Sequence, residues 1–170
     1  MTAFNAPIGR NQIQGAVFLA LAMAAVVGGA LAFEHLGGYM PCKLCLEQRT
    51  PYYVGAPLML LAALSATLRI PAPLTRGLLL FGAGLMAYGL YLAVFHSGVE
   101  WGWWPGPSDC GAVTSAATGG NGVLDVLNTI IPPSCDTAAL RFLGLSMAGW
   151  NAIASLILMG VAVRAAFLRG

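Results

Sequence analysis

Four long stretches without a charged residue constrain the fold of this chain more than any other feature. They cover residues 11–33, 50–68, 77–99 and 142–163, and a charged residue bounds each at both ends. About 20 helical residues cross a hydrocarbon core of about 30 Å. Isolated strands cannot satisfy their backbone groups in lipid, which leaves helices. The sequence therefore predicts an all-α membrane protein, a four-helix transmembrane bundle.

Composition agrees with this class. Hydrophobic residues make up 58% of the 170 residues and charged residues only 8%, whereas a soluble domain carries about 25% charged residues. The net charge of +2 and the lack of a basic cluster exclude a nucleic-acid partner, so membrane lipid is the expected surrounding. We expect a single domain over residues 1–170, with helices at about 13–33, 51–68, 77–96 and 145–163, and outer loops at 34–50 and 97–144.

The charges predict an orientation. One side of the predicted bundle carries five of the eight cations and no acid: Arg10, Arg69, Arg76, Arg164 and Arg169. All six acids fall on the other side, with the remaining three cations. The positive-inside rule then places both termini in the cytoplasm and every cysteine outside. In a bacterial cell this means a multi-pass inner-membrane protein with its cysteine loops in the periplasm, where disulfides persist.

The second outer loop has two features of its own. Three tryptophans lie within residues 100–105, and we interpret them as anchors at the membrane surface, with stacking on a cofactor as the alternative. Further along, the apolar side chains of residues 123–131 fall near one helical face. This spacing predicts a short helix on the membrane surface.

A tight cysteine pair opens the second predicted helix. Cys42 and Cys45 form a C-x-x-C motif, and Arg49 follows Cys45 by four residues, which puts both on one helical face. A helix that starts near Cys45 would direct free N–H groups toward its sulfur. Together with the Arg49 cation, this lowers a thiol pKa and makes the thiolate a nucleophile. A membrane-flanking role is the alternative for Arg49, although arginine on the outer side runs against the topology rule.

The other two cysteines, Cys110 and Cys135, form a wide pair in the second outer loop. Structural zinc would favour two close-spaced pairs, so we expect no metal. A purely structural disulfide between them could stabilise the loop by about 3 kcal/mol, yet a bridge between Cys42 and Cys45 closes almost no loop. Dithiol and disulfide exchange therefore explains all four cysteines best.

These features together resemble the DsbB family, the disulfide bond formation proteins B. The resemblance covers nearly the whole chain and rests on residues 41–49 (Pro-Cys-Lys-Leu-Cys-Leu-Glu-Gln-Arg), Cys110, Cys135, residues 142–147 and residues 96–107. It implies an oxidoreductase that acts on protein dithiols, with a membrane quinone (ubiquinone or menaquinone) as the electron acceptor. It also implies a periplasmic partner of the DsbA type with a thioredoxin fold.

The resemblance further implies a route for the electrons. The partner would attack a Cys110–Cys135 disulfide at Cys110, and Cys135 would exchange with Cys42. Cys45, held as a thiolate by Arg49, would then pass the electrons to quinone from the membrane pool. His96, at the outer end of the third helix, is a candidate for a hydrogen bond or proton exchange at the quinone. A capping or interfacial histidine is the alternative for that residue.

Two rival functions remain open on sequence alone. A vitamin K epoxide reductase-like protein also joins a helical bundle to a C-x-x-C, but there the outer-loop pair precedes the motif, whereas here it follows. A membrane scaffold or transporter subunit with merely structural disulfides is the second rival. Transport usually places ionisable groups inside the spans, and the four apolar stretches contain none except His96.

Overall fold

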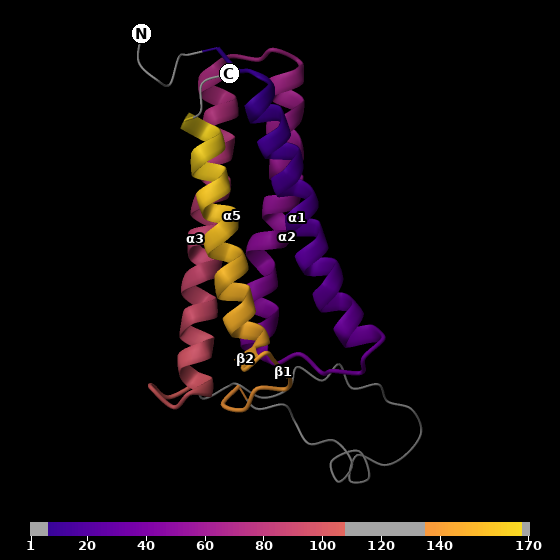
Figure 1. The fold of residues 1–170 in the computed structure, drawn as a ribbon, viewed down its shortest axis with the longest axis vertical. Coiled ribbons are helices and arrows are strands. Elements are labelled where there is room, and N and C mark those ends of the chain that lie inside the picture. Colours follow the sequence, from indigo (N-terminus) through magenta and orange to yellow (C-terminus); the bar gives the residue numbers. More distant parts are fainter. Residues whose placement is uncertain (1–6, 108–134, 168–170) are drawn as a thin grey trace.

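The computed structural model describes residues 7–107 and 135–167. Four long helices run up and down in chain order (Figure 1). They are α1 (Arg10–His35), α2 (Lys43–Thr67), α3 (Ala72–Glu100) and α5 (Met147–Phe167), and two short strands, β1 (Arg141–Phe142) and β2 (Leu145–Ser146), precede the last. We call the end of the bundle where α1 and α3 finish and α2 and α5 begin the thiol end, because it carries Cys42, Cys45 and Cys135.

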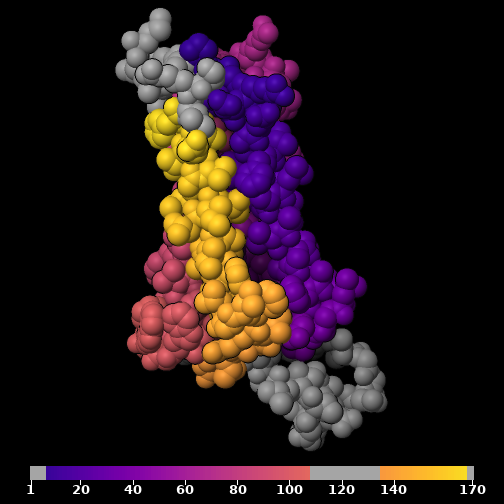
Figure 2. Space-filling model, viewed as in Figure 1, coloured from indigo at the N-terminus to yellow at the C-terminus, as the bar shows by residue number. Residues whose placement is uncertain are grey.

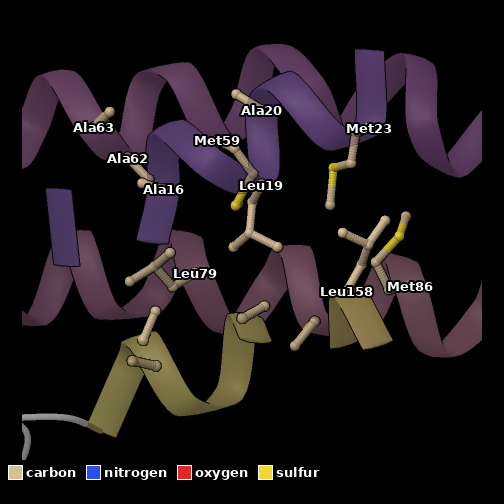
Figure 3. Close-up of a cluster of buried hydrophobic side chains, with 14 of the residues drawn as sticks. Ala16, Leu19, Ala20, Met23, Met59, Ala62, Ala63, Leu79, Met86 and Leu158 are labelled. Atoms are coloured by element: carbon tan, nitrogen blue, oxygen red, sulfur yellow. The ribbon is translucent and has the colours of Figure 1, made fainter. Parts of the chain in front are cut away.

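The helices pack in a closed order, α1 on α2, α2 on α3 and α3 on α5, with a smaller contact between α5 and α1. Their shared core is apolar, and Leu19, Met23, Met59, Leu79 and Met86 are fully buried in it (Figure 3). Small residues bring the helices close. A side chain on Gly55 of α2, for example, would come within 2.8 Å of the Met23 sulfur. Such packing holds helices together in lipid, where the hydrophobic effect contributes little.

Helices α1 and α5 approach closely at Gly15, which gives a test of the bundle. A Cβ at Gly15 would lie 2.8 Å from the Cβ of Ala165, whereas a Cβ at Gly28 of the same helix would meet nothing within 4 Å. We expect Gly15→Val to lower the free energy of unfolding by about 1–3 kcal/mol, the usual effect of overpacking. Denaturant titration in detergent micelles measures it, with Gly28→Val as the matched control. Equal losses in both variants would contradict this packing.

Three of the helices, α1, α3 and α5, are long and apolar enough to cross a membrane. The helical membrane fold predicted from the sequence is confirmed at this level. The fourth long helix, α2, begins at Lys43, well before its apolar stretch, so its first turns carry charged and polar residues. Pro51 and Pro57 also lie inside it. A fourth span therefore stays a prediction, and the predicted surface helix at 123–131 lies outside the described residues.

The last helix starts later than its sequence pattern indicates. Residues 145–146, predicted to open this helix, instead form β2, which pairs antiparallel with β1. Leu143 and Gly144 connect the strands with φ values of 52° and 83°, as a tight two-residue hairpin turn requires. The Ser146 hydroxyl then accepts a hydrogen bond from the Gly149 N–H at 3.2 Å and caps α5. On the face shown in Figure 2, the hairpin residues (orange) lie between the end of α3 (salmon) and the end of α1 (purple).

One predicted flanking cation is buried instead. Arg76, in the second turn of α3 at the end opposite the thiols, is only 1% exposed. Its guanidinium donates a hydrogen bond to the carbonyl of Ala166 in the last turn of α5. A cation suits this place because the last carbonyl groups of a helix carry partial negative charge.

Candidate functional site

Three of the cysteines meet at the thiol end. The sulfur of Cys42 lies 2.6 Å from that of Cys45 and 3.8 Å from Nε2 of His96. The sulfurs of Cys42 and Cys135 and a ring nitrogen of His96 all lie within 4.8 Å of one another. Cys42 and Cys135 are 4% and 2% exposed, and Val99 and Trp104 pack against them. Cys42, His96 and Cys135, which were predicted as site residues from three separate segments of the chain, therefore lie together in one buried cluster. Cys110 lies outside the described residues.

The sequence places Cys42 at the head of α2. Pro41 disfavours helix in the residue before it, and Cys42 follows in extended conformation as the N-cap, with φ −78° and ψ 170°. The N–H of Cys45 points at the Cys42 sulfur, 3.3 Å away. The helix thus begins at Lys43, two residues before the start near Cys45 that the sequence reasoning considered. The Cys45 N–H of the first turn serves the Cys42 sulfur, and the Cys42 side chain and backbone in turn lower the pKa of Cys45.

The two thiols of the motif are inequivalent. Both are free and both precede the apolar stretch of α2. The hydrogen bond from Cys42 lowers the pKa of Cys45 below its ordinary value of 9.0, and the charge of Arg49 lowers it further, although burial opposes both. The same hydrogen bond, together with burial, raises the pKa of Cys42. The pair therefore keeps its proton on Cys42 and presents Cys45 as the thiolate.

Alkylation of the reduced protein tests this difference. At neutral pH we expect iodoacetamide to modify Cys45 well before Cys42, because only the thiolate reacts. The rate at Cys45 should rise with pH with a midpoint below pH 9, whereas Cys42 should stay slow across the same range. Trypsin cleaves after Lys43, so the two cysteines fall in different peptides and mass spectrometry counts them separately. Equal labelling of both peptides would contradict the assignment.

Arg49 has a partner that sequence reasoning missed. Its guanidinium forms an ion pair with the carboxylate of Glu34, at the end of α1. The side chains of Arg49 and Glu34 are 12% and 26% exposed, so solvent screens the pair only partly. The pair fastens the end of α1 to the head of α2 beside Cys45. Nothing in the sequence shows which basic residue Glu34 meets.

His96 lies on the Cys42 side of the cluster. Its Nε2 is 3.8 Å from the Cys42 sulfur and equally far from the Glu100 carboxylate, and its Nδ1 is 2.6 Å from the Gln48 side-chain nitrogen. Sequence reasoning missed Gln48, a neutral residue between two charged ones. Gln48 is noticed only in the structure, where it is a polar side chain with 6% exposure that contacts His96. Contact of His96 with a quinone stays a prediction.

Two further expectations concern this end of the molecule. Trp101 and Trp103 are exposed, as surface anchors would be, whereas Trp104 stacks on Phe95 and donates to its carbonyl oxygen at 2.9 Å. The sulfurs and His96 also offer a ligand set of a type that binds zinc. Cys135, however, is disulfide-bonded, and metals bind the thiolate rather than a disulfide. The cluster as described therefore suits sulfur exchange better than metal binding.

Known proteins share these features. The family described as "Disulfide bond formation protein DsbB" matches residues 13–165, which include most of α1, all of α2 and α3, and most of α5. The chain belongs to the DsbB family. The resemblance inferred from the sequence is thereby confirmed.

Two named relatives agree. A "Disulfide bond formation protein B" from Chromobacterium violaceum is 31% identical over 150 residues, which cover 82% of this chain and 84% of that protein. One of the same name from a Polaromonas species is 27% identical over 139 residues, covering 78% of this chain and 77% of that protein. No solved structure matches the chain. With its apolar helices, this DsbB family member is a multi-pass membrane protein of disulfide bond formation.

Proposed function

We propose that this protein is an inner-membrane thiol:quinone oxidoreductase that reoxidises a periplasmic DsbA-like thiol oxidase. The observation that carries the proposal is the position of Cys135, whose sulfur lies within 4.8 Å of the Cys42 sulfur. A disulfide-bonded cysteine from the second outer loop thus lies beside the free C-x-x-C pair. Disulfides with a purely structural role would not require the Cys135 sulfur to lie so close to the Cys42 sulfur.

The exchange between the two pairs follows from this placement. The partner would attack Cys110 in a Cys110–Cys135 disulfide, and Cys135 would leave with the electron pair. The Cys135 thiolate would then attack Cys42 in an oxidised C-x-x-C, forming a Cys42–Cys135 bond. The Cys42–Cys45 bond breaks, and Cys45 leaves as a thiolate. The lowered pKa of Cys45 makes it the better leaving group of its pair.

The residues beside Cys45 fit a quinone. A bound quinone would accept two electrons and two protons and leave as quinol. Arg49 has five N–H donors, and the only contact described for them is the one with Glu34, so donors remain for a quinone carbonyl oxygen. We therefore assign Arg49 and Cys45 to the quinone site. Exposed apolar side chains nearby, Leu36 and Met40 among them, leave this end open to lipid.

The arrangement of the helices supports the proposed orientation. The thiols lie at one end of the bundle, and the start of α1 and the end of α5 lie at the other (Figure 1). With four spans and both termini in the cytoplasm, the thiols face the periplasm. A soluble thioredoxin-fold partner can reach them there, and Cys45 remains at the lipid boundary.

A turnover assay tests the proposal. Purified protein should oxidise a reduced DsbA-like protein and consume quinone in equal amounts, followed by thiol titration and by quinone absorbance. A variant that lacks Cys110 should lose partner oxidation. Partner oxidation without quinone consumption, or no reaction of the reduced partner, would contradict the function.

A further inference from the structure

A line of buried and partly buried polar side chains crosses three helices and ends at the thiols. Asn151 of α5 donates from Nδ2 to Oε1 of Gln48 in α2 at 2.7 Å. Oδ1 of Asn151 accepts a hydrogen bond from the hydroxyl of Tyr52 at 2.6 Å. That hydroxyl also lies 2.8 Å from the hydroxyl of Ser155. The thiol exchange described above uses none of these groups, yet they lie among the packed helices where apolar side chains would otherwise pack.

A backbone carbonyl fixes the direction of this line. The Gln48 side-chain nitrogen lies 3.3 Å from the carbonyl oxygen of Leu44, and a carbonyl oxygen can only accept. The group of Gln48 that faces Leu44 is therefore its NH₂, which leaves its oxygen for Asn151. Because Tyr52 uses its single proton on Asn151, Ser155 must supply the proton between the two hydroxyls. Every donor thus passes its hydrogen bond along the line in the same order, from Ser155 through Tyr52, Asn151 and Gln48 to His96.

The last hydrogen bond determines the tautomer of His96. The NH₂ of Gln48 is 2.6 Å from Nδ1 of His96, so Nδ1 accepts and carries no proton. A neutral imidazole has one N–H, which must then be on Nε2. Nε2 lies 3.8 Å from the Cys42 sulfur, with the Glu100 carboxylate at the same distance.

We propose that Gln48, Asn151 and Tyr52 are positioning residues that hold His96 as an N–H donor to the Cys42 sulfur. In this form His96 cannot take the Cys42 proton, because its facing nitrogen already bears one. It stabilises the Cys42 thiolate instead. The inference rests on the proposed function for its place in the reaction, but the tautomer itself does not depend on that function.

The donor matters when Cys42 has to leave. Consider a thiolate that attacks the Cys135 sulfur of a Cys42–Cys135 disulfide. It forms a new bond to Cys135, the Cys42–Cys135 bond breaks, and the electron pair of that bond goes to Cys42. A hydrogen bond to a charged group is stronger than one to a neutral group, so the N–H of His96 favours this release. The freed Cys42 is then available to re-form its bond with Cys45, with the membrane quinone of the proposed function as the acceptor of the two electrons.

The tautomer can be read directly. In full-length protein labelled with ¹⁵N-histidine, with His35→Gln leaving His96 as the single histidine, ¹H–¹⁵N correlation spectra show which ring nitrogen carries the proton. We expect the proton on Nε2 in the reduced protein at neutral pH. A proton on Nδ1, or on both nitrogens, would overturn the proposal even if the enzyme turns over as proposed.

Variants connect the tautomer to the chemistry. Asn151→Leu and Tyr52→Phe should each give a mixture of tautomers. In a Cys45→Ser, Cys110→Ser background with the Cys42–Cys135 disulfide formed, each should slow release of Cys42 by dithiothreitol, by about twofold for an equal mixture and by about tenfold where the donor tautomer is nearly lost, the effect of losing roughly one charge-assisted hydrogen bond. Tyr53→Phe is the matched control, since Tyr53 is half exposed, and should change neither result. Unchanged tautomer and release rate in both core variants would overturn the proposal.

Discussion

Replacing Cys45 by serine should abolish quinone reduction while leaving the first exchange with the partner intact. The serine hydroxyl keeps the size of the side chain, but it cannot form a disulfide with Cys42 or leave as a thiolate. Stopped-flow measurement of quinone absorbance, after mixing with reduced DsbA-like protein, measures the loss. A covalent adduct between the partner and Cys110 should still form. Unchanged turnover in Cys45→Ser would contradict the relay.

The second large effect concerns the charge beside Cys45. Arg49→Ala should slow quinone reduction roughly 10-fold to 100-fold, because a hydrogen bond to a charged group contributes about 1.5–3 kcal/mol and 1.36 kcal/mol is tenfold in rate. It should also raise the pKa of Cys45, since Arg49 lowers it. The pH dependence of Cys45 alkylation measures the shift.

Glu34→Gln is the matched counterpart of Arg49→Ala, with the opposite expected effect on the pKa of Cys45. It removes the negative charge paired with Arg49 and leaves the cation unopposed beside Cys45, so the pKa of Cys45 should fall. Exchange at Cys110 should be nearly unchanged in both variants. If Arg49→Ala and Glu34→Gln moved the pKa of Cys45 in the same direction, Arg49 would act through packing rather than charge.

The fold could be predicted because charges mark the ends of apolar helices. The stretch bounded by Arg10 and Glu34 became α1 almost unchanged, whereas α3 ends at Glu100 but begins at Ala72, a full turn before Arg76. The start of α2 could not be found in this way. The first turns of α2 are polar, and a search for apolar residues finds only the later, apolar part of this helix. The hairpin before α5 had a local signal in Gly144, which was outweighed by the apolar residues around it.

The candidate site was predictable where its chemistry is local. Cys42, Cys45 and Arg49 lie within two helical turns, so their spacing alone relates them. The contacts of Arg49 with Glu34 and of Gln48 with Asn151 join different helices. Such pairings depend on how the helices rotate against one another, which a single sequence does not determine.

Disulfide trapping between Cys42 and Cys135 tests the central claim most directly. With Cys45 and Cys110 both replaced by serine, these are the only two cysteines of the chain. Mild oxidation in intact membranes should join them in most molecules, seen by mass spectrometry as one linked pair of peptides, because their sulfurs lie within 4.8 Å. If both cysteines remained open to alkylation after oxidation, electrons could not pass from the outer loop to the C-x-x-C by this route.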